Sequence, residues 1–374
     1  MRLFARKSPP FTSAAPAPVE APPSLRPPQT PVPVSAMRNP GAAKRRFRRR
    51  WLGLDIGSSA VKLVELSRVD ESYRVEAYAF EPIPAGSVVA GNISDARAVG
   101  EAIRSACRRA GVKPQKVCAG IRNSAVVTKT LEMDAMLDDR QMEAEVMREA
   151  GRHIPFPMED VVIDFEPMHL SARDPSKVDV LLVACRVEYV AQWQEAADVA
   201  GLGLDVVDVE SHGAHHAILH AAGSGTPVAL ADIGAATTTV MLVDGDTAVT
   251  REEPFSLSAD TTGEDPADNP AAGRVLDAST VDSLLALLTR LLRLVLLASR
   301  LESVDRLLLA GGGAGIPGLA DRATERLGIS IEIADAFRGM AVSARTDRAS
   351  LAGLAPALFT ACGLAVRGFA EIRT

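Results

Sequence analysis

Two short stretches with the same pattern decide the fold of this chain of 374 residues. The first is Leu54-Asp55-Ile56-Gly57-Ser58-Ser59-Ala60-Val61-Lys62, and the second is Asp232-Ile233-Gly234-Ala235-Ala236-Thr237-Thr238. In both, an aliphatic run typical of a buried strand ends in Asp-Ile-Gly, and small or hydroxyl residues then lead into a further strand. The repetition predicts two halves, each with its own α/β core.

Each of these turns is suited to hold a phosphate group. Tight turns through glycine and small residues direct backbone N–H groups at one point, where an anion can accept from them. Asp55 and Asp232 stand at the strand tips, where a carboxylate can hold Mg²⁺ through its water shell. Lys62, on the strand that leaves the first turn, could reach a phosphate oxygen. The alternative is that both turns serve only the fold.

A third glycine-rich stretch, Gly311-Gly312-Gly313, follows a predicted strand at residues 306–310. A run of glycines lets the backbone approach a flat ligand closely, because no side chain intervenes. One Asp-X-Gly turn alone is common in proteins. Two copies flanked by strands, together with the glycine run, are more specific and favour a nucleotide cleft between two lobes.

The charge of the chain is divided unevenly. Residues 1–50 hold 11 of the 41 Lys and Arg residues and one acidic residue, Glu20, although the whole chain has a formal charge of −6. The remainder is therefore acidic, which argues against binding to nucleic acid. The arm also carries many prolines, so we expect it to be disordered. Its basic cluster at residues 44–51 could adhere to an anionic membrane surface, with a solvated tether as the favoured alternative. Met37 is a possible alternative start.

The cysteine spacing and the hydropathy indicate the kind of compartment that suits the chain. The four cysteines, Cys107, Cys118, Cys185 and Cys362, form no close pair, which argues against a zinc ribbon or a disulfide scaffold and suits a reducing compartment. We expect them to be buried thiols. No apolar run reaches the roughly 18 residues of a membrane-spanning helix. No apolar segment typical of a signal peptide follows the first residues.

Four segments together resemble one known family. They are residues 54–62, the Ile154-Pro155-Phe156-Pro157 segment with the strand that follows it at 161–165, residues 207–211, and residues 232–239. Over about residues 51–369 the chain resembles the PilM family of type IV pilus assembly proteins. The Asp turns are shared with FtsA-type cell-division proteins, whereas the Ile-Pro-Phe-Pro segment and the aliphatic strand at 178–184 favour the pilus family.

The resemblance implies an α/β, actin-like fold of two lobes with duplicated mixed β-sheet cores and an inserted α+β subdomain. It implies a first lobe at residues 51–226 with the insertion at about 123–204. The second lobe, at 227–374, would end in a C-terminal helix that returns to the first lobe. Relatives lie on the cytoplasmic side of the inner membrane, bind ATP, and capture the N-terminal tail of the membrane protein PilN alongside other pilus platform proteins. The peptide groove would lie between the insertion and the first lobe.

The resemblance also carries site residues over to this chain. The first phosphate turn would consist of Asp55, Gly57, Ser58, Ser59 and Lys62, and the second of Asp232, Gly234, Thr237 and Thr238. The run Gly311, Gly312 and Gly313 would lie near adenosine. Asp55 and Asp232 would hold Mg²⁺ through water. We assign no catalytic residue.

This sequence also departs from the family pattern. The interval between Asp232 and Gly311 is short and contains a low-complexity stretch at 259–279, so the helical subdomain that covers the nucleotide is expected to be reduced. ATP binding is then in doubt, and hydrolysis is expected to be weak or absent. Glu210 follows a strand that points at the cleft, where it could activate water or form a structural hinge contact.

Three further features leave alternatives open. His212, His215, His216 and His220 share one predicted helix, where the spacing permits a metal site but packed or exposed histidines are favoured. Ile154 and Phe156 could anchor a partner peptide, with core packing the favoured alternative. For the whole chain, the alternatives to a pilus scaffold are an ATPase or small-molecule kinase and an FtsA-like membrane tether. The C-terminal residues 368–374 are too few for the amphipathic membrane helix of such a tether.

Overall fold

In the computed structural model, the residues described are 2–3, 49–70, 72–113, 116–171, 173–223, 225–245, 247–257 and 276–370. Most of the arm at 1–50, the basic cluster as far as residue 48, Met37, and the loop at 259–279 as far as residue 275 lie outside them. Within the arm, Arg2–Leu3 forms strand β1, which pairs in parallel with β11 (Val206–Val209). This dipeptide therefore differs from the disorder expected of the arm.

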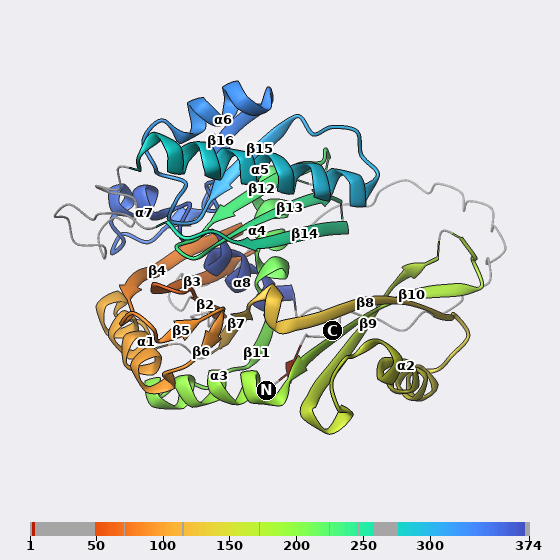
Figure 1. The fold of residues 1–374 in the computed structure, drawn as a ribbon. Helices are drawn as coiled ribbons and strands as arrows, with labels where there is room; N and C mark the ends of the chain where they lie inside the picture. Colours follow the sequence, from red (N-terminus) through yellow and green to blue (C-terminus); the bar gives the residue numbers. More distant parts are fainter. Residues whose placement is uncertain are drawn as a thin grey trace, which may run out of the picture.

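The first lobe is built on a seven-stranded mixed sheet (Figure 1). The order is β1-β11-β7-β2-β3-β4-β17. β2 pairs antiparallel with β3 and parallel with β7, and β7 pairs parallel with β11. A small hairpin, β5 (Val88–Val89) and β6 (Asn92–Ile93), lies beside it. The remaining strands are β2 (Arg50–Ile56), β3 (Ala60–Val69), β4 (Ser72–Pro82), β7 (Val117–Ile121) and β17 (Ala341–Val342).

The second lobe repeats the five central strands of the first. Its sheet has the order β14-β13-β12-β15-β16, which matches β4-β3-β2-β7-β11 strand for strand. The pairings agree as well, because β12 is antiparallel to β13 and parallel to β15, and β15 is parallel to β16. The predicted duplication is therefore confirmed. Its strands are β12 (Val228–Ile233), β13 (Thr237–Asp244), β14 (Thr247–Pro254), β15 (Arg306–Ala310) and β16 (Ser330–Ile333).

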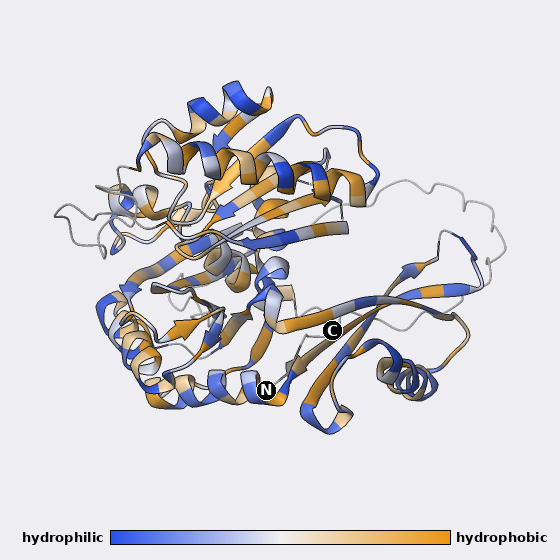
Figure 2. Ribbon diagram, viewed as in Figure 1, coloured by the Kyte–Doolittle hydropathy of each residue, from blue (hydrophilic) through white to orange (hydrophobic). Residues whose placement is uncertain are grey.

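Helices cover the outer face of each sheet. In the first lobe these are α1 (Ala96–Ala110), which begins at the N-cap Asp95 and ends at the left-handed Gly111, and α3 (Val187–Ala200), which packs along α1. In the second lobe, α5 (Ala278–Ser299) and α6 (Leu319–Leu327) take this place. Figure 2 shows hydrophobic central strands beneath helices whose outward faces are hydrophilic. Between β14 and β15, the described residues form one helix, α5.

Two helices lie between the sheets and join the lobes. They are α4 (Glu210–Ala222) and α8 (Phe359–Ala370), and nearly every residue of α8 is buried. The core around them contains side chains from both sheets, from Trp51 and Val64 to Leu230 and Met241. The apolar residues at 351–366 predict a closing helical segment. In this segment the chain forms α7 (Arg348–Leu354) and α8 with a 101° bend between them. The bend lets α8 enter the space between the lobes.

A separate three-stranded sheet projects from the first lobe (Figure 1). β10 (Lys177–Arg186) lies between β8 (Val126–Asp134) and β9 (Val161–Leu170), antiparallel to both. Helix α2 (Asp139–His153) packs on it through its own small core and begins with a capping box between Asp138 and Gln141. Short 3-10 turns at Asn123–Ala125 and Met158–Asp160 connect these elements. Among the described residues, no single helix has both the length and the apolar character of a membrane span.

Candidate functional site

The two Asp turns have the same backbone geometry. Gly57 N donates to Ala60 O at 3.0 Å, and Gly234 N donates to Thr237 O at 2.9 Å. The strand register agrees too, because Asp55 lies opposite Lys62 and Asp232 lies opposite Thr239. The turns are therefore equivalent elements of the two lobes, as the repeated sequence predicts.

The side chains at the two strand tips form one charged cluster. Lys62 Nζ donates to Asp55 Oδ2 at 2.8 Å, and both side chains are largely buried. Burial lowers the pKa of Lys62, but the charges of Asp55 and Asp232 outweigh this effect and raise it above its ordinary value. Burial raises the pKa of Asp232, as does the nearby Asp55, against the opposing charge of Lys62. Lys62 of the first lobe thus attracts a carboxylate from each lobe.

The glycine run packs directly on the second turn. A Cβ at Gly311, where φ is +82°, would lie 2.3 Å from Asp232 Oδ1, and one at Gly313 would lie 2.4 Å from Ile233 Cγ2. Their backbone donors are also used, since Gly311 N donates to Pro356 O and Gly313 N to Ile233 O. The run therefore needs glycine for close packing against the strand tip, and this need is independent of any flat ligand.

The remaining predicted residues take different positions. Thr237 is half-buried and its hydroxyl accepts from Arg122, whereas Ser58 is half-buried and Ser59 is exposed. Thr238 lies opposite Ile233, whose side chain belongs to the core of the second lobe. Because side chains of paired residues share a face of the sheet, Thr238 lies on the face opposite to that of Asp232. It is fully buried there and has no hydrogen-bond partner.

Arg122 and Glu252 are functional candidates that the sequence analysis missed. Arg122 directly follows β7, the strand next to β2, so its side chain leaves the same sheet edge as Asp55. Its guanidinium crosses to the second lobe, where it donates to Thr237 and lies 3.2 Å from Glu252 Oε1. The signal that could have revealed it is its position, since ligands bind at the carboxyl ends of parallel strands.

Glu210 occupies the third strand end of the same edge. It follows β11 and lies near Arg122, Asp55, Lys62 and Glu252. Burial raises its pKa to about 8, against the opposing charge of Arg122, and the charge of Asp55 adds to the increase. A carboxyl group in this state holds a proton near neutral pH.

The charges gathered at the twin turns are of the kinds that would interact with a phosphate and a divalent cation. Besides the protonated Glu210, three carboxylates, those of Asp55, Asp232 and Glu252, lie near two cations, Lys62 and Arg122. Buried carboxylates in excess of cations are unfavourable, so a bound Mg²⁺ would relieve the imbalance and a phosphate would then find Lys62 and the turn amides. Among the described residues, no group of three or more His, Cys, Asp or Glu side chains is arranged to hold a metal ion.

Replacing Glu210 by glutamine is expected to flatten the pH dependence of stability. Between about pH 4.5 and 8 the folded chain keeps this proton while the unfolded chain loses it, so the free energy of unfolding falls as pH rises. The slope is at most about 1.4 kcal/mol per pH unit. Urea unfolding between pH 5 and 8 measures it. The control is Glu195→Gln, an exposed glutamate on α3. Equal slopes in wild type and Glu210→Gln would contradict the prediction.

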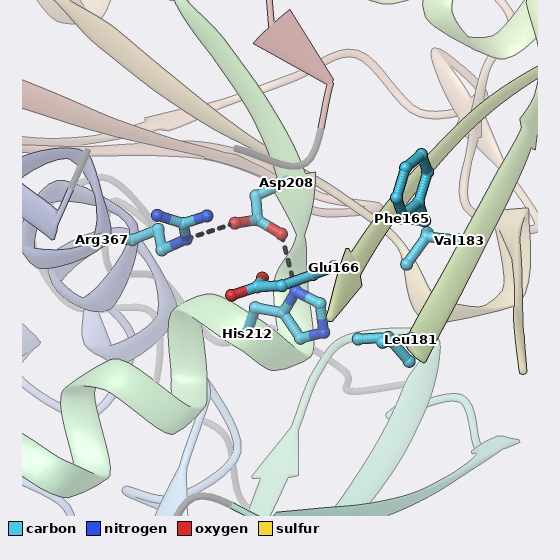
Figure 3. Close-up of a pocket in the computed structure, with 7 residues that line it drawn as sticks. All are labelled: Phe165, Glu166, Leu181, Val183, Asp208, His212 and Arg367. Atoms are coloured by element: carbon cyan, nitrogen blue, oxygen red, sulfur yellow. Dashed lines mark hydrogen bonds and ion pairs between the residues drawn. The ribbon is translucent and has the colours of Figure 1, made fainter. Parts of the chain in front are cut away.

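A second site lies where the three-stranded sheet meets the first lobe (Figure 3). The pocket is shallow, with an accessible volume of about 20 Å³, which is room for about one water molecule. One wall is apolar and comes from β9 and β10, with Phe165, Leu181 and Val183. The other carries the polar groups Glu166, Asp208, His212 and Arg367, of which the last three come from β11, α4 and α8.

Asp208 is the fixed centre of the polar wall. It is fully buried, and its carboxylate accepts from Arg367 Nε at 2.7 Å and bonds His212 Nδ1 at 2.7 Å. Burial raises the pKa of this carboxyl, but His212 and Arg367 outweigh burial and hold the pKa well below its usual range. The pocket floor is thus an ionic network that ties α8 to β11 and α4.

The histidine helix serves packing. His212 bonds Asp208, His215 Nε2 lies 3.0 Å from Gly245 O, and His220 packs edge-on against Tyr73. The ring of His216 lies beside that of His215, with 6.2 Å between the ring centroids.

The remaining candidates divide between core and surface. Ile154 lies in the core beneath α2, whereas Phe156 is partly exposed with the guanidinium of Arg186 5.4 Å from its ring centre. Of the thiols, Cys118, Cys185 and Cys362 are buried and Cys107 is half-buried. Burial raises the pKa of Cys107 to about 11, which makes it a poor nucleophile.

Comparison with known proteins places this geometry in context. Residues 53–261 and 274–369 match a family model described as type IV pilus assembly protein PilM. A solved PilM-PilN type IV pilus biogenesis complex is similar with a TM-score of 0.69 and 29% identity, over 85% of this chain and 98% of that chain. With the duplicated sheets, this match confirms the predicted fold.

Two more distant structures are also similar. The ethanolamine utilization protein EutJ from Carboxydothermus hydrogenoformans has a TM-score of 0.46 and 14% identity, over 85% of this chain and 89% of that chain. A Bacteroides thetaiotaomicron protein with actin-like ATPase fold and unknown function has a TM-score of 0.40 and 7% identity, over 82% of this chain and 95% of that chain.

Proposed function

The chain belongs to the family of the type IV pilus assembly protein PilM, and from this membership we propose that it is a cytoplasmic scaffold that captures the N-terminal tail of a PilN-like inner-membrane protein. The observation that carries the proposal is the similarity to a structure described as a complex of PilM with PilN, which this chain matches over 98% of the solved chain. The scaffold would stand at the inner membrane with other platform proteins. The basic cluster at 44–51 would add attraction to anionic lipid.

The pocket beside the three-stranded sheet is our candidate for the tail-binding site. It lies where the three-stranded sheet meets the first lobe and combines an apolar wall with polar groups. An extended peptide needs both, because an aliphatic side chain gains from burial while its backbone amides need hydrogen-bond partners. The hydrophobic side chains of Phe165 and Leu181 would take the first role, and Glu166 and His212 the second.

Replacing Leu181 by glutamate is expected to weaken tail binding by at least about tenfold, because it puts a charge into the apolar wall of the contact. Isothermal titration with a synthetic N-terminal peptide of the neighbouring PilN-like protein measures the effect. The matched control is Leu297→Glu, since Leu297 is 77% exposed on α5 of the other lobe. If wild type gives no heat, the scaffold proposal fails. If both variants bind as wild type does, only the location is wrong.

We also propose that ATP with Mg²⁺ is a conformational ligand of the twin turns. Lys62 and the amides of the two turns would hold phosphates, and Asp55 and Asp232 would hold the hydrated ion. The ion would supply charge neutralisation between carboxylates and phosphates. The equivalent geometry of the two turns and the excess of carboxylates between them support this proposal.

A further inference from the structure

Arg122 forms an ionic contact between the two lobes at the candidate nucleotide site. It follows β7 of the first lobe, while its two partners, Thr237 and Glu252, belong to β13 and β14 of the second. The side chains of Arg122 and Glu252 are 9% and 13% exposed. The stem of Arg122 passes over Gly91, where a Cβ would lie 2.3 Å from Arg122 Cδ. The local chain therefore makes room for this arginine.

The contact is incompletely satisfied. Arg122 Nε and Glu252 Oε2 are both buried, and neither has a hydrogen-bond partner. A buried donor without a partner is costly, and so is a buried acceptor, whereas a well-formed arginine–carboxylate pair is usually bidentate. Each of these two atoms can therefore gain from a new partner, an oxyanion for the arginine and a cation for the carboxylate.

The position of Arg122 indicates which anion would bind it. It lies between Thr237 of the second turn and the carboxyl groups of Asp55 and Glu210 on the edge of the first sheet. A phosphate held by the two turns would come within reach of its guanidinium. Arginine binds phosphate through the same planar fork that it offers to carboxylate, so Glu252 and a phosphate would compete for it.

We propose that Arg122 is a phosphate-binding residue that Glu252 holds in reserve, so that a polyphosphate bound between the turns replaces Glu252 as its partner and opens the ionic contact between the lobes. This inference rests on the proposed nucleotide site. It adds to that site a residue outside both turns, and it predicts that binding breaks an ionic contact between the lobes. The probes are Mg-ATP and inorganic pyrophosphate with Mg²⁺, because the exchange concerns phosphate and needs no adenosine.

Replacing Glu252 by glutamine in the full-length chain tests the exchange by isothermal titration. If Arg122 is free in about one tenth of wild-type molecules, removing its competitor tightens the apparent Kd for either probe by about tenfold. Glu253→Gln is the matched control. Glu253 is the next residue on β14, and its Oε1 accepts from Arg290 Nη1 of α5 at 2.6 Å, so this variant changes the charge equally without freeing Arg122.

Repeating the test in an Arg122→Gln background separates exchange from simple charge removal. If Glu252 acts through Arg122, Glu252→Gln no longer tightens binding there. Equal tightening in both backgrounds, or with Glu253→Gln, would overturn the inference and leave the nucleotide proposal intact. If wild type binds the probes and Glu252→Gln binds them with the same Kd, the inference is overturned and the nucleotide proposal is again left intact. If no variant binds either probe, the nucleotide proposal fails together with the inference.

Discussion

Replacement of Gly363 by valine is expected to prevent stable folding, with a loss of more than about 5 kcal/mol in the free energy of unfolding. Gly363 lies on α8, and a Cβ there would come 1.8 Å from the backbone oxygen of Gly213 on α4. A backbone atom cannot move aside as a flexible side chain can. The helices would have to separate, and the core that they share with both sheets would open.

The matched control is Gly151→Ala on α2. Nothing lies within 4 Å of a Cβ at Gly151, so this change adds only helix propensity and is expected to stabilise by up to about 1 kcal/mol. Urea unfolding followed by circular dichroism compares the two. A Gly363→Val protein with the unfolding midpoint of wild type would show that α4 and α8 are not packed as described.

Replacement of Asp208 by alanine is expected to cost about 3–5 kcal/mol, because it removes one partner of a buried ionic pair and leaves the other in place. Arg367 Nε lies 2.7 Å from this carboxylate. Burying an unpaired charge costs more than losing a charged pair altogether. The double variant Asp208→Leu with Arg367→Met is therefore expected to recover much of the loss. If the double variant is less stable than Asp208→Ala, the pair is not what makes the single change costly.

The pH dependence of the same network has a definite sign. The pKa of Asp208 is lower in the folded chain than in the unfolded chain, so its contribution to stability is present above the unfolded pKa near 4 and is lost as pH falls. The Asp208→Leu, Arg367→Met protein should lack this component. Unfolding experiments between pH 3 and 7 measure the difference.

The double variant Asp208→Leu with Arg367→Met also distinguishes a role in tail binding from a role in stability. Asp208, Arg367 and His212 form the polar wall of the proposed tail site, and α8 holds Arg367 in place. A stable double variant that no longer binds the tail would show that this network contributes to recognition as well as to stability.

The repeated turns were the part of the site that sequence could predict. Asp55 and Asp232 recur with the same neighbours, and a local turn follows from local residues. The duplication of the sheets followed in the same way, because a repeated pattern implies a repeated core. The bend between α7 and α8 was missed, since the apolar residues of this segment extend through it and the bend depends on where α8 packs.

Local sequence patterns could not predict the contacts of Arg122, Glu252 and the pocket residues. Arg122 and Glu252 come from different lobes, and Phe165 meets Arg367 only because β9 and α8 are brought together. The amino-acid sequence by itself determined the two Asp turns, the duplicated sheets and the family, because hydrophobic periodicity and turn chemistry act between near neighbours. Only the tertiary structure decided which charges form one cluster and what lines the pocket, because burial and Coulomb attraction depend on distance in space.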